Sequence, residues 1–213
     1  MISDGFPQSW IDETDVRHIC LGKSHADYGN TPRGIGAQIA ISENHDAIGF
    51  LDADNTYDLN HIEVCIQSVV AKYDDIQVCD YVIAKRRLVR PDGTTIVESP
   101  KESFVDTNCY LFLRSSFHTI PVWNLMPKPL SVIGDRIFGM YINNQKLNSA
   151  VNPKSTINYL TLLKSIYLAA GENPPNDCKP GIGNDTRLLT WLAHMSDHDR
   201  KITQNILKFV PSI

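Results

Sequence analysis

A short apolar run at residues 47–51, followed directly by Asp52-Ala53-Asp54, constrains the fold of this chain more than any other feature. The run is apolar at nearly every position, as in strands that are buried on both faces of a parallel sheet. Side chains alternate along a strand, so carboxylates at positions i and i+2 project to the same side of its end. Such a pair suits a hard divalent cation that also holds phosphate oxygens. The competing interpretation is a solvated turn, since Asp and Asn are common turn residues.

The rest of the chain alternates strand and helix patterns. Strands are expected at residues 16–21, 47–51, 79–89, 94–97 and 104–113, and helices at residues 37–41, 59–73, 135–143, 158–170 and 184–209. Asn60 is the expected N-cap of the second helix, with Glu63 three residues later. Pro91-Asp92-Gly93 predicts a hairpin turn. This order predicts an α/β fold, with a mostly parallel central sheet flanked by helices, a small antiparallel hairpin and C-terminal helices.

The length of 213 residues suits one α/β domain with a small appendix. We expect a ligand-binding domain over residues 1–150 and a helical extension over residues 151–213. Ligands of open α/β sheets bind at the carboxyl ends of strands. Asp52 and Asp54 are expected at such an end, and this position favours the cation site over the solvated turn.

Charge and composition exclude several classes of function. The net charge of −4 does not favour nucleic-acid binding, and we expect Lys85-Arg86-Arg87 to form the solvated face of a strand. No apolar run approaches the roughly 20 residues of a membrane helix. The first residues lack the basic and apolar regions of a signal peptide. The five cysteines include no Cys-x-x-Cys pair, and their odd number argues against a full disulfide framework, so the expected compartment is the cytoplasm.

Two stretches of the sequence, residues 29–40 and 47–55, resemble the family-2 glycosyltransferases. The shared pattern is a Gly-rich loop that contains Arg33, then a short helix, a strand and an Asp-x-Asp end. Ser3-Asp4-Gly5 is similar to the acidic turn after the second strand of that family, and Gly134-Asp135 to its later acidic motif. The resemblance implies the glycosyltransferase type A fold, which is Rossmann-like and binds nucleoside diphosphate sugars.

The resemblance covers about residues 2–145 and departs from the family pattern in three respects. The family has Arg-Asn-x-Gly where this chain has Arg33-Gly34-Ile35-Gly36. The family has a strand and a helix upstream of the turn that contains Asp4, and this chain starts after them. A sheet shortened in this way would favour pairing with a second copy of the chain. No Gln-x-x-Arg-Trp is present, which disfavours a processive polysaccharide synthase.

The resemblance implies a role for each candidate residue of the donor site. Asp54 would contact Mn²⁺ or Mg²⁺, and Asp52 would hold a metal-bound water or the ribose. Arg33 would reach the nucleotide or the diphosphate, and Asp4 would accept a hydrogen bond from the base or the ribose. Asp135 would be the general base that deprotonates the acceptor hydroxyl. The structural alternatives are a surface-loop arginine for Arg33 and an ordinary N-cap for Asp135.

Candidates for the acceptor side and for a third metal ligand carry a weaker signal. Trp123 would stack on an acceptor sugar or pack in the core, and Arg136 would pair with a phosphate or a carboxylate. His118, His194 and His198 are candidates for a third ligand. The last two are separated by four positions in a predicted helix, a spacing that can chelate a metal.

The predicted function is a metal-dependent, inverting transfer of a sugar from a nucleoside diphosphate sugar to a hydroxyl acceptor. The acceptor would be a sugar, a lipid-linked sugar or a protein. Two alternatives stay open. A non-catalytic relative that binds a sugar nucleotide or a protein partner is favoured by the absent first strand. A nucleotidyltransferase would also use paired aspartates and Mg²⁺, but no Gly-rich loop with Lys or Arg follows a first strand here.

Overall fold

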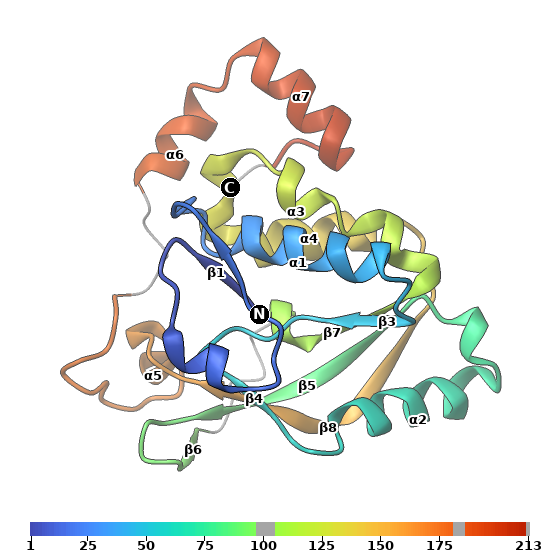
Figure 1. Ribbon diagram of the computed structural model, residues 1–213. Helices are drawn as coiled ribbons and strands as arrows, with labels where there is room; N and C mark the ends of the chain where they lie inside the picture. Colours follow the sequence, from blue (N-terminus) through green and yellow to red (C-terminus); the bar gives the residue numbers. More distant parts are fainter. Residues whose placement is uncertain (97–104, 181–185, 212–213) are drawn as a thin grey trace. The chain divides into compact units, whose positions relative to one another are not determined.

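The chain is organised in two units, and each is described by itself (Figure 1). The computed structural model describes residues 1–96, 105–180 and 186–211. Unit 1 consists of Met1–Ile48, Ser116–Lys146 and Asp185–Ile213, and unit 2 consists of Gly49–Ser115 and Leu147–Asn184. Both units are therefore assembled from segments that are distant in the sequence.

Unit 1 combines a two-stranded parallel sheet with a group of helices. Strand β1 (Ile2–Asp4) pairs with β2 (Ile19–Leu21), and the 3-10 helix η1 (Ser9–Glu13) lies between them in the sequence. Its α-helices are α1 (Asn30–Ser42), α3 (Val122–Leu125), α4 (Gly134–Asn143), α6 (Thr186–Ala193) and α7 (Asp197–Leu207). The 3-10 helices η4 (Arg114–Thr119), within which the chain returns from unit 2, and η5 (Lys128–Ile133) flank α3.

The core of unit 1 forms where α3 meets α1 and α4. The ring of Trp123 is fully buried and stacks on Phe138, with ring centroids 4.4 Å apart. Gly34 of α1 lies so close to Asn124 of α3 that an added Cβ would stand 1.9 Å from the Asn124 Oδ1 atom. A glycine at position 34 therefore permits the close approach of α3 to α1, and this packing is a sufficient reason for its presence.

Unit 2 contains a curled, mixed sheet with the strand order β3-β7-β5-β8-β4, in which β6 also pairs with β5 (Figure 1). Its strands are β3 (Ala47–Gly49), β4 (Thr56–Tyr57), β5 (Tyr81–Val89), β6 (Thr95–Ile96), β7 (Tyr110–Leu113) and β8 (Ser149–Leu160). The chain passes from unit 1 into unit 2 within β3. The helices are α2 (His61–Tyr73) and α5 (Lys164–Ala169), with the 3-10 helices η2 (Ile76–Val78) and η3 (Thr107–Cys109).

The predicted fold class, a Rossmann-like glycosyltransferase type A fold with a mostly parallel central sheet, is wrong. In this sheet β5 is antiparallel to both β6 and β7, and β4 is antiparallel to β8. Parallel pairing joins β5 to β8, and in unit 1 it joins β1 to β2. Parallel neighbours need a crossover of about a dozen or more residues, usually a helix. The predicted hairpin at Pro91-Asp92-Gly93 is confirmed, and it returns the chain directly beside β5, which imposes the antiparallel direction.

The helix predicted at residues 158–170 is also wrong at its start. Strand β8 continues to Leu160, and α5 begins only at Lys164. The predicted helix at 184–209 is two helices in the described structure, α6 and α7. The helix at 59–73 is confirmed as α2, with Asn60 at the N-cap position, although its side chain makes no capping hydrogen bond in the described structure. Residues 97 and 104, at the ends of two predicted strands, lie outside the described residues.

A buried polar cluster joins α2 to β8. The Nδ1 atom of His61 lies 2.7 Å from Thr156 Oγ1, and the ring of Tyr57 stacks on the imidazole with centroids 3.9 Å apart. Only 3% of His61 is exposed. Burial lowers the pKa of His61 below its ordinary value of 6.5, against the opposing effect of the Asp58 carboxylate. The cluster therefore favours the neutral imidazole.

We expect acid to destabilise unit 2 through His61. Below about pH 6.5 the unfolded imidazole binds a proton that the folded one resists, so the free energy of unfolding falls as pH falls. Urea midpoints at pH 7.5, 6.5 and 5.5, followed by circular dichroism, would measure this loss. His61→Gln should flatten the dependence, whereas His45→Gln, at an exposed histidine, should not. If both variants keep the wild-type slope, the cluster is not the acid-sensitive group.

Candidate functional site

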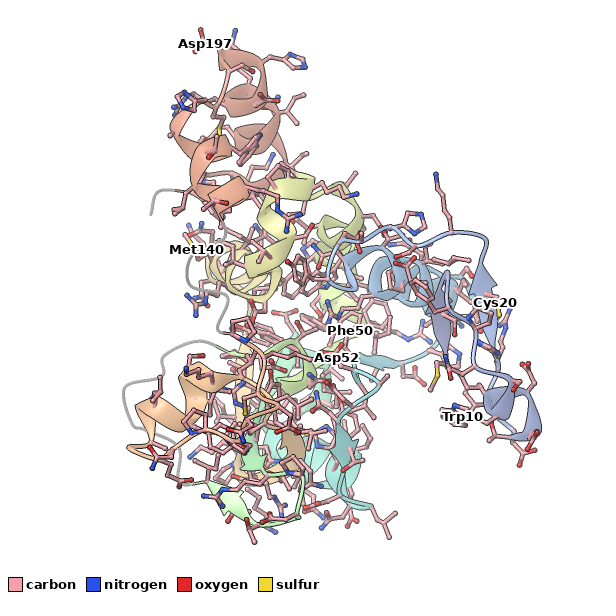
Figure 2. The ribbon with its side chains drawn as sticks, turned by 90° about the vertical axis from the view of Figure 1, so that its left-hand side faces the viewer. Trp10, Cys20, Phe50, Asp52, Met140 and Asp197 are labelled. Carbon is pink, nitrogen blue, oxygen red and sulfur yellow. The ribbon has the colours of Figure 1, made fainter. Side chains whose placement is uncertain are left out.

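The segment after β3 forms a turn that carries the paired aspartates. The Asn55 amide donates to the Asp52 carbonyl at 3.0 Å, which closes the turn. The buried Asn55 side chain accepts from the Leu160 amide at 2.9 Å and so fixes the turn to the end of β8. Figure 2 marks Asp52 just beyond Phe50, at the end of β3. A turn, as in the competing interpretation of Asp52-Ala53-Asp54, is thus present.

Asn108 of η3 holds this turn against a third carboxylate. Its Oδ1 atom accepts from the Asp52 amide at 2.7 Å, and its Nδ2 atom donates to Asp52 Oδ2 at 3.2 Å and to Asp106 Oδ1 at 2.6 Å. Asp106 is also the N-cap of η3 and accepts from the Asn108 amide at 2.9 Å. Asn108 is completely buried, so its amide group fixes the positions of both carboxylates.

A buried arginine supports the same group from β5. One Arg86 guanidinium nitrogen lies 3.6 Å from Asp106 Oδ2, and the guanidinium lies 4.8 Å from the centroid of the Tyr159 ring. Arg86 and Asp106 are each 8% exposed. The expectation that Lys85-Arg86-Arg87 forms a solvated face is therefore wrong for Arg86, although Lys85 is exposed.

The site concentrates negative charge near Asp54. Loss of hydration raises the pKa of Asp54, the Asp52 carboxylate raises it further, and Asp106 adds a smaller effect in the same direction. Lys179 acts in the opposite direction. Burial, with a contribution from Asp106, raises the pKa of the Tyr159 hydroxyl. The arrangement therefore favours a positively charged ligand beside Asp54.

We call Asp52, Asp54 and Asp106 the carboxylate cluster. Across residues 1–96, 105–180 and 186–211, no three His, Cys, Asp or Glu side chains are arranged to hold a metal by themselves. Mg²⁺ commonly binds one or two carboxylates and takes its remaining ligands from phosphate oxygens and water. The oxygen donors of the cluster fit that second type of site.

The other sequence candidates lie in unit 1 and make contacts of their own. Asp4 accepts from the His25 amide at 2.9 Å and lies 2.5 Å from its Nδ1 atom. Burial opposes the effect, but these hydrogen bonds lower the pKa of Asp4. Arg33 donates to the Tyr28 carbonyl at 2.8 Å, and its guanidinium lies 5.5 Å from the ring centroid of Trp123. The structure therefore brings Arg33 and Trp123 together, and it pairs Asp4 with a histidine.

The remaining candidates lie on α3, on α4 and among the histidines, of which the exposed His118 is in the last turn of η4. The Trp123 ring is 1% exposed, which matches the core packing that the sequence left open. Asp135 lies in the first turn of α4, and its Oδ1 atom accepts from the Arg136 amide at 2.8 Å. The expected placement of His194 and His198 on one helix is wrong, because α6 ends at Ala193 and α7 begins at Asp197.

Sequence reasoning missed Arg86, Asp106 and Asn108. Arg86 carries no local sign of burial, because it lies between two other basic residues of β5. Asp106 could have been found as an N-cap, since Asp followed two residues later by a donor is a common turn arrangement. Nothing near it in the sequence points to Asp52, which is on a different segment.

No protein-family model matches this chain, and no curated protein matches it. Among the described residues, no helix is long and apolar enough to cross a membrane. A functional proposal therefore depends on the chemistry of the carboxylate cluster and on the sequence resemblance.

Proposed function

We propose that the carboxylate cluster binds a nucleoside diphosphate sugar together with Mn²⁺ or Mg²⁺, and that the chain transfers the sugar to a hydroxyl acceptor. The observation that carries this proposal is the position of Asn108, whose side chain binds the Asp52 and Asp106 carboxylates next to the turn that contains Asp54. Asn108 holds the Asp52 and Asp106 carboxylates in place, and both raise the pKa of Asp54. A bound cation would relieve their mutual repulsion, and phosphate oxygens would complete its coordination.

The cluster residues have distinct tasks in this proposal. Asp54 is the direct ligand, because lost hydration and then the Asp52 carboxylate raise its pKa, and a bound cation would favour its ionised form. Asp52, fixed by Asn108, orients the diphosphate or a coordinated water. Lys179 supplies a positive charge toward Asp54 that suits a phosphate oxygen. A divalent ion bound there would stabilise the charge that develops on the departing nucleoside diphosphate.

The remaining roles come from the sequence resemblance alone. It implies that Asp135 is the general base for the acceptor hydroxyl and that Arg33 and Asp4 contact the nucleotide. In unit 1 Arg33 and Asp4 already have partners, Tyr28 and His25 respectively. Nucleotide binding in this role would require Arg33 and Asp4 to share or exchange these hydrogen bonds.

Calorimetric titration with UDP and with GDP would test the donor site. We expect binding in the presence of Mn²⁺ or Mg²⁺ and its loss when EDTA is added, because the carboxylates repel the diphosphate unless a cation lies between them. Affinity should also rise with pH through the titration of Asp54, since the metal needs the ionised carboxylate. Metal-independent binding, or no binding of either nucleotide, would contradict the proposal. Binding without sugar transfer to any acceptor would favour the non-catalytic alternative.

A further inference from the structure

A second constellation of polar side chains lies near the start of unit 1. The Oγ atom of Ser3, in β1, lies 2.7 Å from His18 Nε2, and His18 Nδ1 lies 2.8 Å from Asp12 Oδ1. The three residues come from separate elements: β1, the residue before β2, and η1. A hydroxyl, an imidazole and a carboxylate are thus aligned in that order, each within hydrogen-bond distance of the next.

The order of these groups fixes the proton on the imidazole. An ionised carboxylate only accepts hydrogen bonds, so Nδ1 carries the proton and donates to Asp12. The Nε2 atom is then an acceptor and faces the hydroxyl of Ser3. The His18 side chain is only 4% exposed, which limits its freedom to rotate. This is the arrangement in which an imidazole can withdraw a proton from a hydroxyl nucleophile.

Backbone pairing keeps the hydroxyl in place. Ser3 lies opposite Cys20 in the parallel β1–β2 ladder, and the Ile19 amide donates to the Met1 carbonyl at 2.9 Å. Cys20 is exposed, and its Sγ atom lies 3.5 Å from the same Nε2 atom. Figure 2 marks Cys20 on this strand. Two nucleophilic atoms therefore share one base, and the hydroxyl is the closer of the two.

We propose that Ser3 is the nucleophile of an acyl-transfer site, with His18 as its general base and Asp12 as the positioning residue. The substrate class is a small ester with a good leaving group. The Oγ atom attacks the acyl carbon while its proton moves to His18 Nε2. The ester C–O bond then breaks, and the proton passes to the departing alkoxide, which leaves an acyl-serine. Water hydrolyses the acyl-serine by the reverse proton movement. The proposal is independent of the carboxylate cluster.

The test uses the full chain and p-nitrophenyl acetate. We expect a burst of about one p-nitrophenolate per chain, as covalent acyl transfer requires, and an acetyl group on Ser3 in peptide mass spectrometry. His18→Gln should slow acylation by about 100-fold or more, the usual contribution of a general base. His45→Gln and Ser42→Ala, at exposed positions of unit 1, are matched controls and should leave the burst unchanged.

The variant Asp12→Asn separates the positioning role of Asp12 from a structural one. The Asp12 side chain is 65% exposed, so the loss of its charge should not unfold the unit. We expect slower acylation and a pH–rate midpoint that moves to lower pH, since an amide no longer stabilises the imidazolium. An unshifted midpoint would overturn the role of Asp12. Acetyl on Cys20 instead of Ser3, acetylation that His18→Gln does not slow, or no burst at all would overturn the proposal.

Discussion

The Asp54→Asn variant is expected to lose metal-dependent nucleoside diphosphate binding by at least about 100-fold, or about 2.7 kcal/mol. The amide keeps the size of the side chain and one oxygen but removes the charge that a divalent cation requires. Because Asp52 and Asp106 remain, a loss of affinity could be attributed to Asp54, the residue whose pKa is raised. Calorimetry with UDP or GDP and Mn²⁺ measures the change directly.

The same substitution is expected to raise the thermal midpoint of the metal-free chain. The folded state raises the pKa of Asp54, so its carboxyl group ionises less readily in the folded chain than in the unfolded chain. The free energy of unfolding therefore falls as pH rises through the folded-state pKa. A neutral amide removes this cost, and a gain in stability with a loss of binding is typical of functional positions.

The matched control is Asp74→Asn. It removes one exposed carboxylate of unit 2 at a position with φ of 60°, a backbone conformation that Asn tolerates. It should change neither the affinity nor the thermal midpoint appreciably. Unchanged binding in Asp54→Asn, or equal effects in the two variants, would remove Asp54 from the proposed site.

The Arg86→Met variant should have the largest effect on stability, a loss of about 3–5 kcal/mol in the free energy of unfolding. Met fills a similar volume but leaves the buried Asp106 carboxylate without the guanidinium beside it. The second substitution Asp106→Asn should recover much of the loss, because a buried neutral amide needs no counter-charge.

Urea titration of the two single variants and the double variant gives the coupling energy between Arg86 and Asp106. Lys85→Met is the matched control, since it removes an exposed charge from the adjacent position of β5 and should cost little. If Arg86→Met and Lys85→Met have equal effects, the Arg86–Asp106 pair does not stabilise the unit. The single variant Asp106→Asn also tests whether the Arg86–Asp106 ion pair is needed to hold the Asn108 side chain in place.

The sequence predicts the elements whose signals are local. Helix α2 has apolar residues at helical spacing, the hairpin has a Pro-Asp-Gly turn, and the aspartates follow an apolar strand. The helix predicted at residues 37–41 begins earlier, at Asn30, and includes Pro32 in its first turn. Proline costs little there, because the first turn of a helix has no partner for its amide.

The parts that the sequence does not predict depend on distant partners. The apolar residues from Leu160 onward have helical spacing, but pairing with β5 keeps the chain extended up to Leu160. Tertiary pairing of this kind overrides local propensity. The contact of Asn108 with Asp52 and that of Arg86 with Asp106 likewise join separate segments. Periodicity reports which face of an element is apolar, and it carries no information about which polar groups meet.

The pairing of β5 with β8 also has a consequence for the order in which the chain folds. Tyr81 pairs with Ser149 and Val89 with Leu160, and the intervening segment from Ser116 to Lys146 belongs to unit 1. Contacts between residues so far apart in sequence form slowly. During synthesis, the edge of β5 that pairs with β8 stays unpaired until β8 has been synthesised. In that interval the nascent chain exposes an unpaired strand edge, so its yield in cells should depend on chaperones more than its final stability would suggest.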